Sequence, residues 1–96
     1  MKLLTIIYDS GIDETMMDLV ESLGVSGWTK LSDLLGSGGR GPKLNSAIFP
    51  GTNHLLLVAV PDDQVERIRL ALRRLQSEFR LKPGITLLCQ DVEMLP

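Results

Sequence analysis

The stretch LLLVAVPDDQVERIRLALRRLQSEF, residues 55–79, decides the fold. It opens with an unbroken apolar run that is typical of a buried strand, and Pro61 ends this run because proline cannot donate to a strand ladder. Asp62 is expected to cap a helix whose acidic residues come early and whose basic residues come late, as the helix dipole prefers. Apolar residues recur along this helix at spacings of three and four, at Val65, Ile68, Leu72, Leu75 and Phe79.

The same strand-and-helix pattern occurs at the start of the chain. The segment KLLTIIY, residues 2–8, predicts a strand, and a helix is expected to follow it with Ser10 or Asp13 as its cap. Gly24 suits the left-handed position after the last turn of that helix. The apolar face of the helix is predicted at Ile12, Met16, Val20 and Leu23.

Two further strands complete the pattern, one from about Val25 to Leu31 and one from Ile85 to Val92. The order strand, helix, strand, loop, strand, helix, strand is that of the α+β, ferredoxin-like βαββαβ fold. This fold has a four-stranded antiparallel sheet with both helices on one face. We therefore expect residues 1–96 to form a single domain of this class.

The predicted central strands are apolar on both of their sides. Residues 55–60 do not alternate with polar residues, and residues 3–8 are interrupted only by Thr5. A strand with one face in water should alternate, so both sides of this sheet are predicted to be buried. A second copy of the chain is the expected cover, in a closed homo-oligomer. The alternative is a monomer with an exposed apolar sheet.

Composition excludes several classes of function. The net charge is −2, whereas a nucleic-acid-binding domain is usually basic, so no nucleic-acid partner is expected. The first apolar run is too short for a membrane span, so the chain is not expected to be membrane-embedded. The single cysteine, Cys89, cannot form an internal disulfide and is expected to lie in the core, which fits a cytoplasmic protein.

Residues that carry catalytic or metal chemistry are few. The single histidine, His54, and Cys89 have no metal-ligand neighbours at a recognisable spacing. His54 is interpreted as a strand-end residue, and the alternative is an intersubunit metal site formed with Asp91 and Glu93. No nucleophile elbow, phosphate-binding P-loop or paired acids can be identified, so the chain is not expected to be an enzyme.

A glycine-rich connection, GSGGRGPKLNSAIFPG at residues 36–51, separates the two halves of the pattern. We expect it to be an insertion at about residues 36–52 without regular structure and mobile when no ligand is bound. Glycines at 36, 38, 39 and 41 can direct successive backbone N–H groups at an anion. Arg40 and Lys43 add positive charge, and Arg40 can hold a phosphate or carboxylate through two hydrogen bonds.

Several short motifs, in order, resemble the PII-like family of proteins related to the nitrogen regulatory protein P-II. Gly27-Trp28-Thr29 is similar to the family's glycine, hydrophobic, threonine motif on the second strand. Gly36-x-Gly38-x-Arg40-Gly41 resembles the motif at the base of the family's long T-loop, with one residue inserted. Residues 58–65 resemble its strand end and second helix start. The T-loop is short here, and residues 79–84 replace the family's phosphate-binding B-loop in truncated form.

The resemblance implies a homotrimer with T-loops at clefts between subunits, where an adenine nucleotide (ATP, ADP or AMP) would bind. The loop at residues 36–52 would then contact a partner protein. By position, Thr29 would match an adenine contact, and Arg80 and Lys82 would add charge from the stretch before the last strand. The full predicted ligand-binding set is Thr29, Gly36, Gly38, Arg40, Gly41, Lys43, Arg80 and Lys82.

Three hypotheses follow. The first is a trimeric, non-enzymatic signalling protein that senses a small anionic ligand. The second is a CutA-like trimer on the same fold that binds a divalent metal, which His54 alone supports. The third is an oligomeric interaction module without a ligand. The glycine loop that contains Arg40 favours the first.

Overall fold

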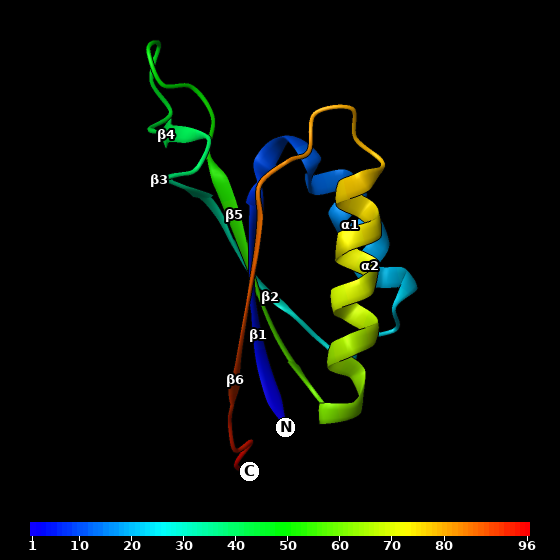
Figure 1. Cartoon of the computed structure of the whole chain (residues 1–96). Coiled ribbons are helices and arrows are strands. Elements are labelled where there is room, and N and C mark those ends of the chain that lie inside the picture. The colour runs from blue at the N-terminus through cyan, green and yellow to red at the C-terminus, as the bar shows by residue number, and fades with distance from the viewer.

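The computed structural model describes all 96 residues and has two layers, a sheet and a pair of helices (Figure 1). The four-stranded sheet has the order β2-β5-β1-β6, and neighbouring strands run antiparallel. Both helices lie on one face of it, so the predicted ferredoxin-like βαββαβ fold is confirmed. The strands are β1 (Lys2–Asp9), β2 (Thr29–Leu34), β3 (Gly36–Gly38), β4 (Gly41–Lys43), β5 (Asn53–Val60) and β6 (Ile85–Asp91). The helices are α1 (Asp13–Ser22) and α2 (Val65–Ser77), preceded by the 3-10 turns η1 (Ser10–Ile12) and η2 (Asp62–Gln64).

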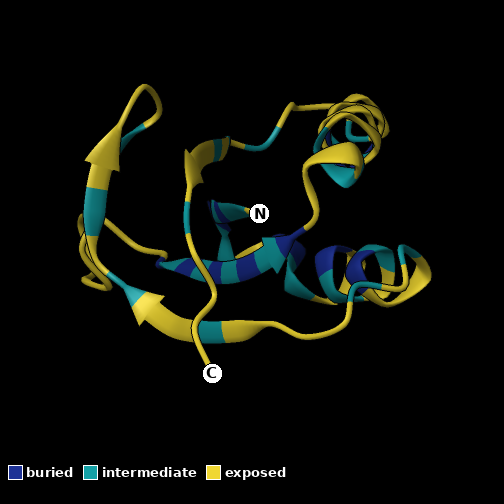
Figure 2. Cartoon of the chain, turned by 90° about the horizontal axis from the view of Figure 1, so that it is seen from below, coloured by how far each residue is buried: buried dark blue, intermediate teal, exposed yellow.

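The core lies between the helices and the two central strands, β1 and β5. Along these strands buried residues alternate with half-buried ones (Figure 2). Successive side chains of a strand point to opposite faces, so the buried ones lie toward the helices. The predicted helical faces supply the rest of the core, and burial of these aliphatic side chains is the main stabilising term. The buried set is Leu4, Ile6, Tyr8, Ile12, Met16, Val20, Leu56, Val58, Val60, Ile68, Leu72 and Leu75.

The sheet face away from the helices is apolar and uncovered within one chain. Leu57 lies at its centre, opposite Thr5 on β1 and Thr29 on β2. Leu88 on β6 continues this row beside Thr5, and Leu31 on β2 lies in the next row opposite Leu55; the two leucines are 52% and 44% exposed. The sequence predicts that both sides of β1 and β5 are buried, and the single chain buries only the side that faces the helices.

The second strand differs from its predicted range. β2 begins at Thr29 and extends to Leu34, because its register with β5 starts at Thr29 and Leu57. The register shifts between Leu31 and Leu34, where Asp33 has a φ of 58°. This irregularity removes the apolar alternation that sequence patterning relies on. The last strand ends at Asp91, one residue before the predicted end.

Both predicted helix caps are wrong, and the reason is the same in each case. A 3-10 turn precedes each α-helix, so the capping position lies before that turn and not at the predicted residue. The cap of the first turn is Asp9, whose Oδ1 accepts a hydrogen bond from Gly11 N at 2.6 Å. Asp62 makes no cap, and its carboxylate instead accepts a hydrogen bond from the Met1 amine at 2.7 Å. Gly24 has the expected positive φ, 67°.

Cys89 is exposed, so its predicted place in the core is wrong. Its register partner on β1 is the buried Leu4, but β6 is an edge strand. Of this strand only Ile85 and Leu87 pack against the core. No helix of the chain has the length and apolar character needed to cross a membrane.

A polar cluster ties β1, α1 and β2 together inside this fold. The Tyr8 hydroxyl donates to Asp13 Oδ1 at 2.6 Å, and Lys30 Nζ donates to both Asp13 oxygens at 3.1 Å. Burial, together with the Asp13 carboxylate, raises the pKa of Tyr8 well above its usual value. Burial acts to raise the pKa of Asp13, but its hydrogen bonds to Tyr8 and Lys30 outweigh it and lower that pKa.

Tyr8→Phe is expected to lower the free energy of unfolding by about 1–3 kcal/mol, because it removes the hydroxyl that donates a hydrogen bond to Asp13. Denaturant unfolding followed by circular dichroism measures the change. Glu14→Gln, an exposed position in the first turn of α1, is the matched control and should change stability little. Equal stability of Tyr8→Phe and the wild type would contradict a structural role for the cluster.

Candidate functional site

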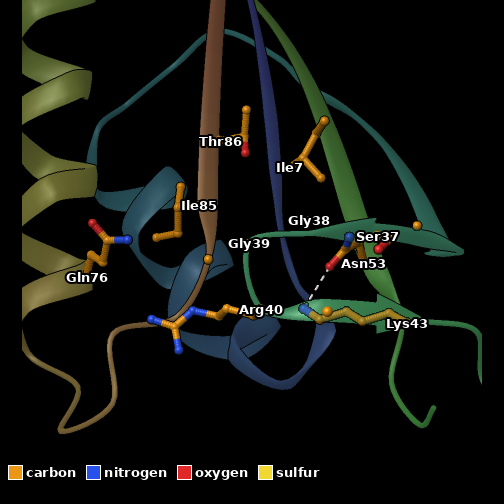
Figure 3. A pocket seen from close by; sticks show the side chains of 13 residues that line it. Ile7, Ser37, Gly38, Gly39, Arg40, Lys43, Asn53, Gln76, Ile85 and Thr86 are labelled. Carbon is orange, nitrogen blue, oxygen red and sulfur yellow. Dashed lines mark hydrogen bonds between the residues drawn. The ribbon is translucent and has the colours of Figure 1, made fainter.

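A hollow of about 290 Å³ lies where the glycine-rich segment meets the end of the sheet (Figure 3). It is enclosed by the β3–β4 hairpin, the adjoining parts of β1 and β5, the start of β6 and the end of α2. The lining residues are Ile7, Gly36, Ser37, Gly38, Gly39, Arg40, Gly41, Lys43, Asn53, Gln76, Gly84, Ile85 and Thr86. Ile7 and Thr86 are cross-strand partners on the uncovered sheet face, so the hollow opens onto that face.

The glycine-rich segment is partly regular, contrary to the expectation of a structureless loop. Residues 36–43 form a small hairpin in which Gly36 pairs with Lys43 and Gly38 with Gly41. Its turn is Gly39-Arg40, and Gly41 follows with a φ of 92°, which glycine adopts without strain. Sequence patterning misses such a strand because glycine has no side chain to show a period. Residues 44–52 contain no strand or helix.

Arg40 lies at the tip of the hairpin and reaches across the hollow. Figure 3 shows its side chain extending from the hairpin toward α2, below Ile85. A Cβ atom at Gly84 would lie 3.9 Å from Arg40 Cδ, so the guanidinium stem passes close to the chain before β6. Arg40 forms no ion pair within the chain. Its charge therefore remains available to an anion in the hollow.

Lys43 also lines the hollow, but its charge is already compensated. Lys43 Nζ donates to Asp9 Oδ2 at 2.7 Å and to Asn53 Oδ1 at 2.9 Å, and the side chain is 19% exposed. Burial acts to raise the pKa of Asp9, but the hydrogen bonds from Lys43 and from Gly11 N outweigh it and lower that pKa. The hollow thus combines one free cation, Arg40, with one paired cation, Lys43.

Gln76 fixes the other side of the hollow. Its Nε2 donates to the Pro83 carbonyl oxygen at 2.7 Å, which ties α2 to the short connection that leads into β6. Gly84 follows Pro83 and borders the hollow directly. Sequence reasoning missed Gln76, and also Asn53 and Thr86, because only the tertiary arrangement brings them together. The predicted topology could have found Asn53 and Thr86, because the fold places the start of β5 and the start of β6 at the same end of the sheet.

The predicted ligand-binding residues fall into three places. Gly36, Gly38, Arg40, Gly41 and Lys43 line the hollow together. Thr29 lies elsewhere, in a separate depression that it shares with Trp28 and Leu57 on the uncovered face. Arg80 and Lys82 are exposed in the connection before β6 and do not line the hollow.

The His54 side chain is buried and makes its contacts within the fold. It is 9% exposed, its Nδ1 accepts a hydrogen bond from Asp33 N at 3.1 Å, and its ring meets Tyr8 edge-on. Asp91, the metal-ligand partner considered for it, lies at the opposite end of β1, opposite Lys2. Within one chain no cluster of three or more histidine, cysteine or acidic side chains is arranged to hold a metal ion.

The family assignment rests on a comparison with family models. The model of the nitrogen regulatory protein P-II matches residues 1–88, so the chain belongs to the P-II family. No curated protein sequence matches this chain closely enough to count as a relative. The recognition of a PII-like protein from its short motifs is thereby confirmed.

Solved structures of PII-like proteins share the fold. CPII from Thiomonas intermedia K12 bound to ADP and bicarbonate has 22% identity and a TM-score of 0.71, covering 95% of this chain and 86% of CPII. CPII bound to ADP, AMP and bicarbonate gives a TM-score of 0.72 at the same identity and coverage. A putative PII-like signaling protein from Thermus thermophilus has 25% identity and a TM-score of 0.64, covering 95% of this chain and 85% of that one.

Gly41→Ala is expected to destabilise the hairpin by about 1–2 kcal/mol, because its φ of 92° is strained for a residue with a Cβ atom. Loss of the cross-strand nuclear Overhauser effects between Gly36 and Lys43 would report the change. Gly39→Ala is the matched control, since no atom lies within 4 Å of the added Cβ and its φ is not in that region. If both variants keep the hairpin equally well, the conformation of Gly41 does not hold it together.

Proposed function

We propose that this chain is a non-enzymatic regulator that binds an adenine nucleotide, ADP or AMP before ATP, in the hollow beneath the glycine hairpin. The observation that carries this proposal is the hairpin itself, with Arg40 unpaired at its tip and the turn amides of Gly39 and Arg40 beside it. The CPII structures with ADP, AMP and bicarbonate support the same ligand class. Ligand binding would be passed to a partner protein in the cytoplasm through residues 36–52.

The proposed ligand contacts come from the hairpin side of the hollow and from the exposed connection before β6. Gly36, Gly38 and Gly41 pair across the hairpin and use their N–H groups there, so they border the site through their lack of side chains. The N–H groups of the turn, at Gly39 and Arg40, with the Arg40 guanidinium, would bind phosphate or bicarbonate oxygens. Arg80 and Lys82 are exposed near the same end of the fold and can add charge when the ligand extends beyond the hollow. Thr29 is too far along β2 to join these groups within one chain, so its proposed adenine contact requires a neighbouring subunit.

The proposed assembly is a homotrimer that covers the apolar sheet face. Leu57 and Leu88 lie on that face without cover, and an exposed apolar sheet of this kind favours association. The hollow opens onto the same face at Ile7 and Thr86. A subunit packed there would therefore border the ligand, which makes the site a cleft between subunits.

Isothermal titration calorimetry with ADP, AMP and sodium bicarbonate tests the ligand. Arg40→Ala is expected to weaken binding by about tenfold to a hundredfold, because a lost charge-assisted hydrogen bond costs about 1.5–3 kcal/mol. Arg73→Ala, an exposed arginine on α2 outside the hollow, is the matched control and should bind as the wild type does. If Arg40→Ala binds as tightly as the control, the hairpin is not the binding element. If the wild type binds none of the three at millimolar concentration, a ligand-free interaction module is the better description.

Light scattering tests the assembly. The wild type is expected to have about three times the monomer mass of 10.6 kDa. Leu57→Glu is expected to abolish the oligomer, because a charge buried without a partner in the interface is costly. Leu70→Glu is the matched control, since Leu70 is a leucine of α2 that is 49% exposed. A wild-type mass of one chain at micromolar concentration would contradict the trimer.

A further inference from the structure

The carboxylate of Asp9 joins the turn that leads into α1 to the glycine hairpin. Its Oδ1 accepts a hydrogen bond from Gly11 N at 2.6 Å and so caps the turn that leads into α1. Its Oδ2 accepts one from Lys43 Nζ at 2.7 Å and so holds the last residue of the hairpin. Asp9 itself does not line the hollow. Asp9 can therefore affect a ligand in the hollow only by positioning the hairpin or through its charge at a distance.

The register of the central strands explains why Lys43 is held so firmly. Asp9 ends β1 and Asn53 begins β5, and the two are direct cross-strand partners. Their side-chain oxygens therefore lie together, and both accept from Lys43 Nζ. The lysine stem runs past Gly51, where an added Cβ atom would lie 3.9 Å from Lys43 Cγ. Lys43 is thus fixed along its length, and Figure 3 shows its amine directed at Asn53.

The hairpin has little else to hold it in place. It consists of two three-residue strands, and an isolated two-stranded hairpin is marginal in water. Its strands GSG and GPK contribute no large apolar side chain to the core. The apolar residues that follow it, Leu44, Ile48 and Phe49, are all exposed. An ion pair reinforced by an amide oxygen is therefore a substantial part of what docks the hairpin.

We propose that Asp9 and Lys43 form a latch that holds the glycine hairpin against the end of the sheet, with Lys43 as a positioning residue and not a ligand contact. The part of this proposal that concerns a ligand rests on the proposed function of the hollow. With the latch closed, the hairpin amides and Arg40 are held over the hollow. With the latch open, the hairpin leaves the sheet and its ligand-binding groups no longer converge.

The variant Asp9→Asn distinguishes positioning of the hairpin from a direct effect of the Asp9 charge on the ligand. The asparagine oxygen can still accept from Gly11 N, so the cap is retained while the ion pair with Lys43 is lost. By charge alone, removing an acid near the hollow and freeing Lys43 would strengthen the binding of an anion. The latch predicts the opposite, a dissociation constant for ADP about tenfold higher. Asp91→Asn, which breaks the Lys2–Asp91 ion pair at the other end of β1, is the matched control.

A measurement without ligand keeps this test independent of the proposed function. In ¹⁵N relaxation of the ligand-free protein, order parameters of the amides of residues 36–43 are expected near 0.85 in the wild type and below about 0.6 in Asp9→Asn and Lys43→Met. Lys43→Arg, which keeps the charge, should restore rigid values, and the control Asp91→Asn should not lower them. Unchanged order parameters in Asp9→Asn, or tighter ADP binding by it, would overturn the latch. Absence of ADP binding by the wild type would count against the proposed function and leave the relaxation result to decide on the latch.

Discussion

The structure depends on the pairing of β1 with β5, two strands that are apolar on both of their faces. Their register, from Lys2 opposite Val60 to Asp9 opposite Asn53, aligns two rows of aliphatic side chains back to back. One row meets the helices and forms the buried core. The other row has no cover in the chain, and this uncovered apolar surface is what favours assembly. The edge strands β2 and β6 pair with the outer sides of β5 and β1, and both helices pack on one face of this central pair.

The same pairing also sets the position of the proposed ligand site. Both strands are apolar along most of their length and become polar at one shared end, where Asp9, Asn53 and His54 lie. At that end His54 fixes the bulge of β2, and Asp9 with Asn53 fixes the hairpin through Lys43. The hairpin at residues 36–43 therefore needs no large apolar side chain of its own. Polar contacts, and not burial, hold it in place, and in the proposed function its turn amides and Arg40 face the anion.

The sequence predicts the fold well because periodicity reports burial. The apolar runs at residues 3–8 and 55–60 and the helical face from Val65 to Phe79 lead to the observed order of elements. The misses occur where burial gives no signal. The 3-10 turns moved the capping positions away from the predicted residues. The bulge at Asp33 interrupts the alternation of β2, and the glycines of the hairpin have no side chains from which a strand could be predicted. For the site, the chain indicated Arg40 and its glycines, but Gln76, Asn53 and Asp9 join them only through tertiary packing.

Charge balance links the ligand to the assembly. Within one chain the hollow offers the free charge of Arg40, because Lys43 is neutralised by Asp9. A nucleoside diphosphate such as ADP carries several negative charges, so a single chain is a poor match for it, whereas a small monoanion is matched by Arg40 alone. Further cations, such as Arg80 and Lys82, lie outside the hollow on an exposed connection. A neighbour packed on the apolar face is the remaining source of contacts. If the proposed nucleotide site and the proposed oligomer both hold, nucleotide affinity and subunit association must be thermodynamically linked, because each would stabilise the cleft that the other requires.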